Sequence, residues 1–538
     1  MKRLLLGLLF ALLVAVAPAA EIVVVAHEPG YYTSLAKHVQ RWLKQQQVPA
    51  TLETPKTMAQ AFKDAKLVFL VGFNEPTPAE MTAIRQCRAE GARFVVFYSA
   101  SPALADMMGV KPLGYKTASY PGEWSRMNFS CKFLEGCPSS ILQTSTCIQR
   151  AAAIPGKSRV MATWCDRKGK TTGEPAWLSS PAGYWMTHVF LADGDEALKA
   201  QLLGAFVGSV APKLWNEKSF RARAQAERES ITRLAARQMP RPNEIHAVWD
   251  HSGCGLYPGD WPRTMRLLKA YGVTDLFVNV AGAGFAHYPS DVLPRSKTFA
   301  QEGDQLKACL AAAKGTGIRV HAWILCFNAT RATPDRMEIF RQRGWRLKDK
   351  EGKLTDYLDP SNAAVRKYLL DAVDEIQSRY AVDGIHLDFV RWYERSVRPA
   401  DAASVISKFV ASARLHVRRP AWFTTAVLGK YPQCVSTVGQ DWTAWLDTNV
   451  VDYVVPMDYT EDMAKFESFL QQHAQNRSRA RRTIAGIGVT ANESRLTPVQ
   501  VIQQNLLARK YGLAGVALFD LDTTLEKQIL PYLTMGLW

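Results

Sequence analysis

After residue 242 a short apolar segment followed by a helical segment recurs along the chain, and this repeat most limits the possible folds. Eight segments have the length and composition of buried strands. They are Glu244–Trp249, Asp275–Val280, Arg319–Leu325, Gly384–Asp388, Trp422–Val427, Asp452–Pro456, Thr483–Gly488 and Gly515–Phe519. Helical segments lie between most of them, at Pro262–Tyr271, Asp304–Lys314, Ala363–Tyr380, Ala402–Val417, Met463–His473 and Pro498–Tyr511. Eight repeats over about 300 residues are typical of a (β/α)8 TIM barrel, which we predict over residues 243–538.

Residues 20–210 alternate strand and helix in a different pattern. Buried strands are predicted at 22–26, 67–71 and 93–98, and later ones at 160–164, 176–178 and 184–191, the last as an edge hairpin. This rhythm predicts a doubly wound α/β domain with helices on both faces of the sheet. It resembles flavodoxin-like and class I amidotransferase-like modules. There is no Gly-x-Gly-x-x-Gly motif, and Cys87 lies inside a helix, so we predict a structural or substrate-presenting role.

Two further segments complete the predicted organisation. Residues 1–19 have a basic start, an apolar stretch from Leu4 to Val16 and small residues at the end, which is typical of a signal peptide. The stretch is too short to span a membrane comfortably, and no later segment is apolar enough, so the mature chain is expected to be exported to the periplasm or secreted. Residues 211–242 are charged and helical and end at Pro240 and Pro242, which predicts a helical linker.

Composition narrows the possible partners. The formal net charge of +17 favours anionic glycans or envelope phosphates, although a generally basic solvated surface explains it equally well. No nucleic-acid-binding motif is present, so nucleic acid is not expected as a partner. Four of the nine cysteines, Cys131, Cys137, Cys147 and Cys165, lie close together in sequence and predict one or two disulfides. No cysteine spacing indicates zinc, no cofactor is predicted, and the oligomeric state stays open.

Polar and aromatic side chains follow the predicted barrel strands, where the active sites of TIM barrels lie. In strand order they are Trp249, Asp250 and His251; Asn279; Trp323 and Asn328; Asp388, Arg391 and Trp392; Lys430; Asp458 and Tyr459; Asn492 and Glu493; Asp520 and Asp522. Aromatic rings stack on the faces of sugar rings, and carboxylates and amides bind hydroxyls. Glycosidic cleavage needs two carboxyl roles. The predicted partner is therefore a polysaccharide or oligosaccharide, with an anionic one among the options.

Several of these residues have structural alternatives. Trp249 and Trp323 fit ordinary barrel packing equally well, and Asp250 fits a strand-end hydrogen-bond acceptor. His251 fits a structural histidine. A metal held by Asp250, His251 and Asp388 stays open, although no H-E-x-x-H or H-x-x-E-H motif supports it.

Four stretches resemble one family of exported bacterial proteins. Residues 357–362, 382–392, 451–459 and 515–519 are similar to the glycosyl hydrolase-like barrels of the family 10-like group. The resemblance implies a barrel acting on a polysaccharide, with Asp388 as the central catalytic residue. Trp249, Trp323, Trp392 and Tyr459 are then expected to line sugar subsites, together with His251, Asn279, Asn328 and Asp520. Arg391 is expected to keep Asp388 ionised.

The same stretches are distantly similar to family 18 chitinases, with one departure. Chitinases carry their proton-donating glutamate two residues beyond the acid of the fourth strand, and here that position is Val390. Asp458 is our first candidate for the missing acid, because it can face Asp388 across the barrel, and Asp250 and Asp520 come next. The alternative to a glycoside hydrolase is a non-catalytic glycan-binding or envelope-structural protein on a degenerate barrel. A third possible function is a metal-dependent deacetylase.

Overall fold

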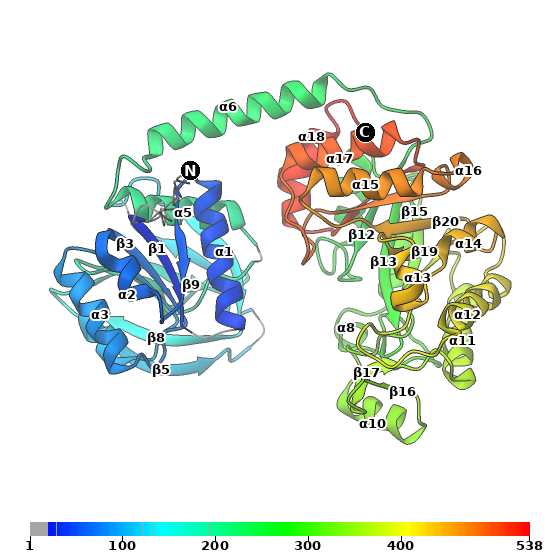
Figure 1. The fold of residues 1–538 in the computed structure, drawn as a ribbon, viewed down its shortest axis with the longest axis horizontal. Coiled ribbons are helices and arrows are strands. Elements are labelled where there is room, and N and C mark those ends of the chain that lie inside the picture. The colour runs from blue at the N-terminus through cyan, green and yellow to red at the C-terminus, as the bar shows by residue number, and fades with distance from the viewer. Residues whose placement is uncertain (1–19, 28–29, 121, 132, 193) are drawn as a thin grey trace, which may run out of the picture. The chain divides into compact units, whose positions relative to one another are not determined.

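The computed structural model describes residues 20–538 except 28, 29, 121, 132 and 193, so the predicted signal peptide lies outside the described residues. The chain forms two compact units, residues 1–227 and 228–538, and the division falls within helix α6 (Glu217–Ala236) (Figure 1). This point lies inside the segment predicted as a linker.

In the first unit, a sheet with helices on both faces confirms the α/β prediction. Its strand order is β2-β1-β3-β4-β11-β10-β9-β6-β7. The parallel part consists of β1 (Ile22–Ala26), β2 (Thr51–Glu53), β3 (Leu67–Val71), β4 (Arg93–Phe97) and β11 (Gly183–Met186). Alternate strand residues face two separate cores. Helices α1 (Tyr31–Gln45) and α5 (Glu196–Gly208) cover one face, and α2 (Met58–Ala61), α3 (Pro78–Ala89) and α4 (Pro102–Met107) cover the other.

The edge-hairpin prediction for residues 184–191 is wrong. Strand β11 pairs in parallel with β4 on one side and antiparallel with β10 (Thr171–Ser180) on the other, so it lies inside the sheet. Strand β9 (Arg159–Cys165) is present where a strand was predicted at 160–164, whereas no strand was predicted for β6 (Trp124–Phe129) and β7 (Ser140–Ser145). These strands, and the separate pair β5 (Val110–Thr117) and β8 (Cys147–Ala153), are half polar because one of their faces is solvated.

The second unit is a closed barrel of eight parallel strands, and all of its residues, 228–538, are described. The strands are β12 (Ile245–Asp250), β13 (Asp275–Gly282), β15 (Arg319–Leu325), β18 (Gly384–Asp388), β19 (Trp422–Leu428), β20 (Tyr453–Met457), β21 (Ile484–Gly488) and β22 (Gly515–Phe519). Each predicted strand is present within two residues of its predicted ends. Pairing of β12 with both β13 and β22 closes the ring.

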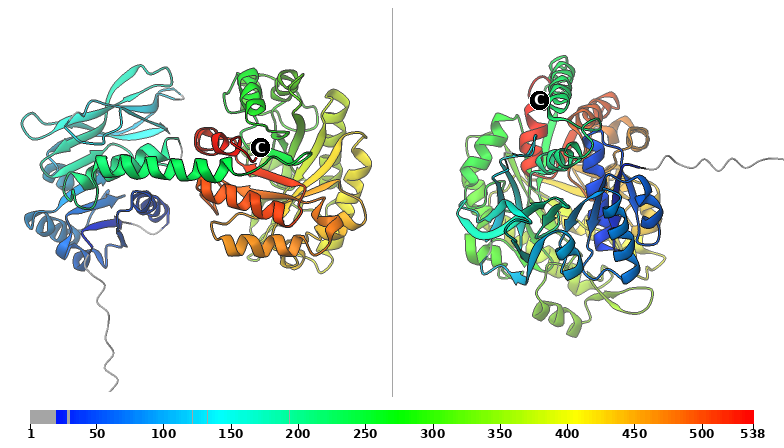
Figure 2. Two further views of the ribbon diagram at one scale, coloured as in Figure 1. Left: turned by 90° about the horizontal axis from the view of Figure 1, so that it is seen from above. Right: turned by 90° about the vertical axis from the view of Figure 1, so that its left-hand side faces the viewer.

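Helices surround these strands (Figure 2). They include α7 (Trp261–Ala270), α9 (Gln305–Ala313), α11 (Ala363–Arg379), α12 (Ala402–His416), α14 (Trp442–Asp447), α15 (Met463–His473) and α17 (Pro498–Lys510). Inward-facing residues form a small inner core, and outward-facing residues pack against the helices in a much larger one. This alternation decides which strand-end side chains reach the mouth of the barrel.

Candidate active site at the barrel mouth

Asp388 ends strand β18 and is 4% exposed. One carboxylate oxygen accepts the backbone N–H of Phe389 at 2.5 Å. Burial raises the pKa of Asp388, and the Arg391 guanidinium, the Phe389 amide, the Trp323 indole and His251 only partly oppose this rise. Arg391 thus favours the ionised form of Asp388, as expected, but desolvation raises the pKa by more than this attraction lowers it.

Tyr459 stands at the centre of a group of acids from three strand ends. Burial raises its pKa well above the usual range, and the carboxylates of Asp388, Glu493 and Asp520 raise it further. The ring packs 5.5 Å from that of Phe519. The barrel thus brings Asp388, Glu493 and Asp520 close enough to the Tyr459 hydroxyl to raise its pKa, although they lie up to 132 residues apart in sequence (520 − 388 = 132).

His251 lies on the same side of the mouth. The residue as a whole is solvent-accessible, but its imidazole packs 5.8 Å from the rings of both Trp323 and Phe519. This local desolvation and the nearby Arg331 lower the pKa of His251, and Asp388 opposes the decrease. Histidine and carboxyl group therefore interact, and their surroundings favour the neutral form of each.

Some buried polar atoms near these groups have no hydrogen-bond partner among the described residues, and two of them are considered for ligand binding. One is Oδ1 of Asn279, whose amide nitrogen donates to the His251 carbonyl at 3.2 Å. The other is Nη1 of Arg391. The Arg391 guanidinium lies 4.2 Å from the Phe389 ring centre, and its Nε is 3.4 Å from Glu394. Buried polar atoms are normally paired, so these two are exceptions within the barrel.

Asp458 does not face Asp388, and that expectation is wrong. Its carboxylate is fully buried and accepts from His473 Nε2, with oxygen distances of 3.0 and 3.2 Å. His473 ends helix α15, which belongs to the outer layer. Side chains alternate along an extended chain, so Tyr459 faces the barrel interior and Asp458 faces the helices.

Asp250 is occupied by its own loop. Its Oδ1 accepts the hydroxyl and backbone N–H of Ser252 at 2.6 and 3.1 Å and the N–H of Gly253 at 3.2 Å, and its Oδ2 accepts the N–H of Gly255 at 2.8 Å. Burial raises the pKa of Asp250 against these bonds. The carboxylate acts as the strand-end acceptor that the sequence offered as the alternative, and it folds the loop between β12 and α7.

Of the four aromatic residues predicted to line sugar subsites, only some lie at the mouth. Trp249 fills the barrel interior and donates from Nε1 to His386 Nε2 at 3.0 Å. Trp392 is 2% exposed and packs in the outer core, so its predicted sugar contact is wrong. Trp323 is 3% exposed but lies against His251, and with half-buried Tyr459 it is the aromatic contribution that the structure brings to Asp388.

The remaining predicted residues lie in the surrounding loops. Asn328 uses its Oδ1 to accept the backbone N–H and hydroxyl of Thr330 at 2.9 and 2.7 Å, so it shapes the loop after β15. Asp520 is half-buried, accepts the Thr490 hydroxyl at 3.0 Å and has its pKa raised chiefly by burial.

Two residues of the mouth were not chosen from sequence. Glu493 follows β21, is exposed, and was noted only as one strand-end acid among several. Arg331 lies in the loop after β15, 3.9 Å from the Phe285 ring centre, with Nη2 3.2 Å from His287 Nε2. The position of Glu493 at a strand end was a usable signal, whereas nothing in the sequence distinguishes Arg331 from other loop arginines.

Two further features are absent from the residues that the structure describes. Among them no three His, Cys, Asp or Glu side chains are grouped so as to hold a metal ion. Within the same residues no helix has the length and apolar character needed to cross a bilayer.

Part of the barrel matches a known protein family. Residues 244–408 match the family model described as Glycosyl hydrolase-like 10. This part of the barrel is similar to that family. This match confirms the resemblance seen in the four sequence stretches, two of which lie within it. A comparison with curated proteins finds no match.

Solved structures similar to this chain include glycosidases that share little sequence with the glycosyl hydrolase-like barrel. An α-L-fucosidase from Paenibacillus thiaminolyticus is 12% identical, with a TM-score of 0.37, and the match covers 54% of this chain and 48% of the fucosidase. A class V chitinase from Pseudomonas fluorescens is 12% identical, with a TM-score of 0.36, and covers 55% of this chain and 99% of its own. A ThuA-like protein from Bacteroides uniformis is 13% identical, with a TM-score of 0.29, covering 36% and 95%.

Proposed function

We propose that this protein is an exported glycoside hydrolase-like enzyme that cleaves a glycosidic bond of a polysaccharide or oligosaccharide at the barrel mouth. One observation carries the proposal. Asp388 is a desolvated carboxyl group with a raised pKa, and two further acids, Glu493 and Asp520, lie with it around Tyr459. Glycosidic cleavage uses one carboxylic acid that keeps its proton and a second group that acts on the sugar or on water.

The environment of Asp388 suits the proton donor. A buried carboxyl group keeps its proton to higher pH and can transfer it to the leaving oxygen. This is the role that the sequence analysis assigned first to Asp458. Glu493 is the candidate for the second role because it is exposed and follows β21, the strand next to the one that leads to Tyr459, and Asp520 is the next candidate.

The neighbouring groups have roles in binding. The free atoms of Asn279 and Arg391 are placed to bond sugar hydroxyls, and Trp323 offers an aromatic surface. Tyr459 can hydrogen-bond an acid and a substrate oxygen at once. His251 is favoured as a neutral imidazole, which can accept or donate a hydrogen bond at the entrance.

The test is a glycan panel that includes amino-sugar polymers and acidic exopolysaccharides, with products detected by mass spectrometry. Wild type is compared with Asp388→Asn, Glu493→Gln and the control Glu351→Gln, which removes an exposed acid from the β16–β17 turn (Arg346–Lys348 and Leu354–Leu358). Shorter glycans from wild type and the control, but not from Asp388→Asn, are expected. Equal products from Asp388→Asn would remove Asp388 from the mechanism.

A second function, glycan binding without cleavage, is favoured by one specific observation. Two of the three acids chosen from sequence, Asp250 and Asp458, are engaged by protein groups. Under this function, glycans are retained equally by wild type and Asp388→Ala, and no product forms on any glycan that the protein retains. Product from any retained glycan would exclude it.

Export rests on the leader-like N-terminus. The measurement is the mass of the protein recovered outside the cytoplasm, which is expected to begin at Ala20 or Glu21. A protein that stays in the cytoplasm with its first residues intact would contradict this part of the proposal.

A further inference from the structure

The first unit contains a cavity of about 720 Å³ whose charged lining residues are all cationic. Its lining residues are Arg93, Phe133, Leu134, Gly156, Lys157, Ser158, Arg159, Ser179, Ser180, Pro181, Tyr184 and Ser209. The volume is within the usual range for small-molecule sites. Three of these residues are cationic and none is acidic.

The cations are not neutralised by neighbouring acids. Within the described residues, no ion pair joins Arg93, Lys157 or Arg159 to a carboxylate. Arg93, Arg159 and Tyr184 line the same cavity, and both guanidinium groups lower the pKa of the Tyr184 hydroxyl against the effect of burial. Like charges held together without a counter-charge repel each other, so an anion between them is favoured.

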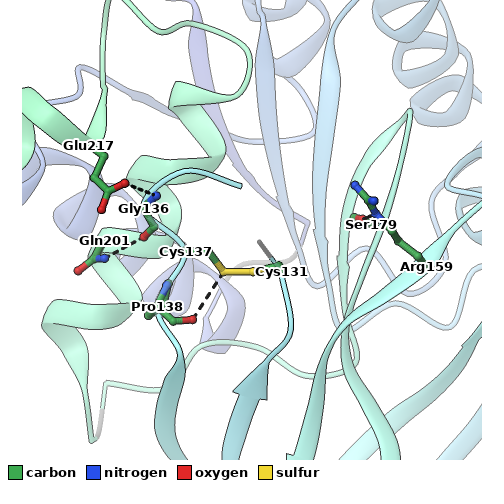
Figure 3. The surroundings of a disulfide bond; sticks show 8 residues. All are labelled: Cys131, Gly136, Cys137, Pro138, Arg159, Ser179, Gln201 and Glu217. Atoms are coloured by element: carbon green, nitrogen blue, oxygen red, sulfur yellow. Dashed lines mark hydrogen bonds between the residues drawn. A yellow bond between two sulfur atoms is a disulfide. The ribbon is translucent and has the colours of Figure 1, made fainter. Parts of the chain in front are cut away.

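Hydroxyl groups surround the cations. Tyr184 donates to the Ser209 hydroxyl at 3.0 Å, and Ser209 donates onward to the Phe206 carbonyl at 2.7 Å. Arg159 donates from Nε to the Ser179 hydroxyl at 3.3 Å (Figure 3), which leaves its two terminal nitrogens for a ligand. These groups can bond several oxygens of one molecule.

An aromatic ring forms one wall, and a disulfide fixes the loop that carries it. Phe133 is 42% exposed and lies between Cys131 and Cys137, which form a disulfide; the Arg159 guanidinium is 3.5 Å from its ring centre. The Gly136 carbonyl accepts from Gln201 at 2.8 Å, and the Gly136 N–H donates to Glu217 at 3.1 Å (Figure 3). The loop is thus tied to helices α5 and α6, and the wall is preorganised.

Its location is unusual for an open α/β sheet. Arg93 begins β4, and Tyr184 lies near the start of β11, which runs parallel to β4. The cavity therefore lies at the amino ends of the parallel strands, whereas such sheets usually bind ligands at the carboxyl ends. The strand-end stretches noted in the sequence, Gly72–Asn74 and Ser99–Ser101, do not line it.

We propose that this cavity binds a sugar unit that carries a carboxylate or a phosphate. Arg93, Arg159 and Lys157 bind the anionic group, the serine hydroxyls bind the ring hydroxyls, and Phe133 packs against the ring. A basic site of this kind in the first unit would hold an anionic glycan independently of any chemistry in the barrel.

The experiment is calorimetric titration of the full chain with glucuronate, glucose 6-phosphate, glucose and inorganic phosphate. Binding of at least one anionic sugar is expected, about tenfold tighter than binding of glucose. A preference for glucuronate assigns a carboxylated ligand, and a preference for glucose 6-phosphate assigns a phosphorylated one. Three outcomes would overturn the proposal. Glucose could bind as tightly as both anionic sugars, or inorganic phosphate could bind as tightly as glucose 6-phosphate. The third outcome is that no sugar binds at about 10 mM.

Variants locate the binding. The double variant Arg93→Gln with Arg159→Gln is expected to bind the anionic sugar about tenfold or more weakly than wild type. The matched control, Arg85→Gln with Lys111→Gln, removes two exposed cations of the same unit and is expected to leave affinity unchanged. Where the double glutamine variant fails to fold, Lys157→Glu, at an exposed turn position, is expected to weaken binding similarly. Unchanged affinity in the folded cavity variants would exclude this cavity, whatever the barrel hydrolyses.

Discussion

The two ends of the barrel carry buried carboxylates in opposite electrostatic situations. At the amino ends of the strands, Asp275 of β13 accepts two bonds from Arg319, at 2.7 and 2.6 Å, and one from His321 at 2.8 Å. Burial opposes ionisation, but these partners lower the pKa of Asp275 to about 2. At the carboxyl ends, Asp388 of β18 is equally buried and has its pKa raised.

The difference lies in the partners and not in the depth. Asp275 is 1% exposed and Asp388 is 4% exposed, so both carboxyl groups are desolvated. Asp275 has a cation and a histidine in direct contact, whereas Asp388 has a backbone bond and weaker support from the Trp323 indole, His251 and a more distant cation. A satisfied carboxylate adds to stability, and an unsatisfied one keeps a proton available for chemistry. TIM barrels typically divide their two ends in this way.

The largest expected effect is on activity at the mouth. Asp388→Asn is expected to lower kcat/KM on a cleaved glycan by about 10²–10⁴-fold, because the amide cannot transfer a proton. The melting temperature is expected to stay at or above that of wild type, since the substitution removes a desolvated acid. A lower melting temperature of Asp388→Asn would show that the Asp388 carboxylate stabilises the fold, as that of Asp275 does.

The next effect is on stability at the amino end. Asp275→Asn leaves Arg319 without its counter-charge and is expected to cost about 3–5 kcal/mol of the free energy of unfolding of the barrel. Urea titration of the full chain measures it, with Asp388→Asn as the control at the other end. Activity per folded molecule is expected to be unchanged, and a large fall in kcat/KM would break the proposed division of roles.

The two acids also predict pH dependences of opposite sign. The folded-state pKa of Asp275 lies below the unfolded value of about 3.9, so its contribution is present above pH 4 and decreases as the pH falls towards 2. The loss is about 2–3 kcal/mol. The folded-state pKa of Asp388 is raised, so stability decreases as the pH rises through that value. Unfolding measured against pH is expected to lose the first slope in Asp275→Asn and the second in Asp388→Asn.

The smallest effect concerns the tyrosine among the mouth acids. Tyr459→Phe is expected to lower kcat/KM about tenfold, roughly 1.4 kcal/mol, because one hydrogen bond to an acid or the substrate is lost. Its ring contacts with Trp249 and Phe519 persist, so the melting temperature is expected to change little. An unchanged kcat/KM would show that the Tyr459 hydroxyl does not contribute to catalysis or substrate binding.

Prediction from sequence succeeded where a pattern is periodic. The barrel strands were located because a strand buried on both sides is a continuous apolar run, and Gly515–Phe519 is an example. The half-polar strands after residue 102 were mostly missed, since one face is solvated and the apolar signal is halved. Asp388 was identified because it ends a strand, and it does lie at the mouth.

The direction in which a side chain points and its hydrogen-bond partners could not be predicted in the same way. Asp458 and Tyr459 are adjacent in sequence, yet one faces helix α15 and the other faces the acids of the mouth. Asp250 and Asp388 both end strands, and only the loop after β12 folds back to satisfy its acid.

The sequence by itself determined the α/β class, the eight barrel strands and the family resemblance, because burial periodicity and short motifs are local properties. Tertiary structure alone decided which acids remain unpaired, which side chains enter the mouth and where the basic cavity of the first unit lies. Each of these depends on groups far apart in the chain: His473 lies 15 residues from Asp458, and Arg159 lies 66 residues from Arg93 (159 − 93 = 66). Charge and desolvation act through space, and a linear pattern records neither.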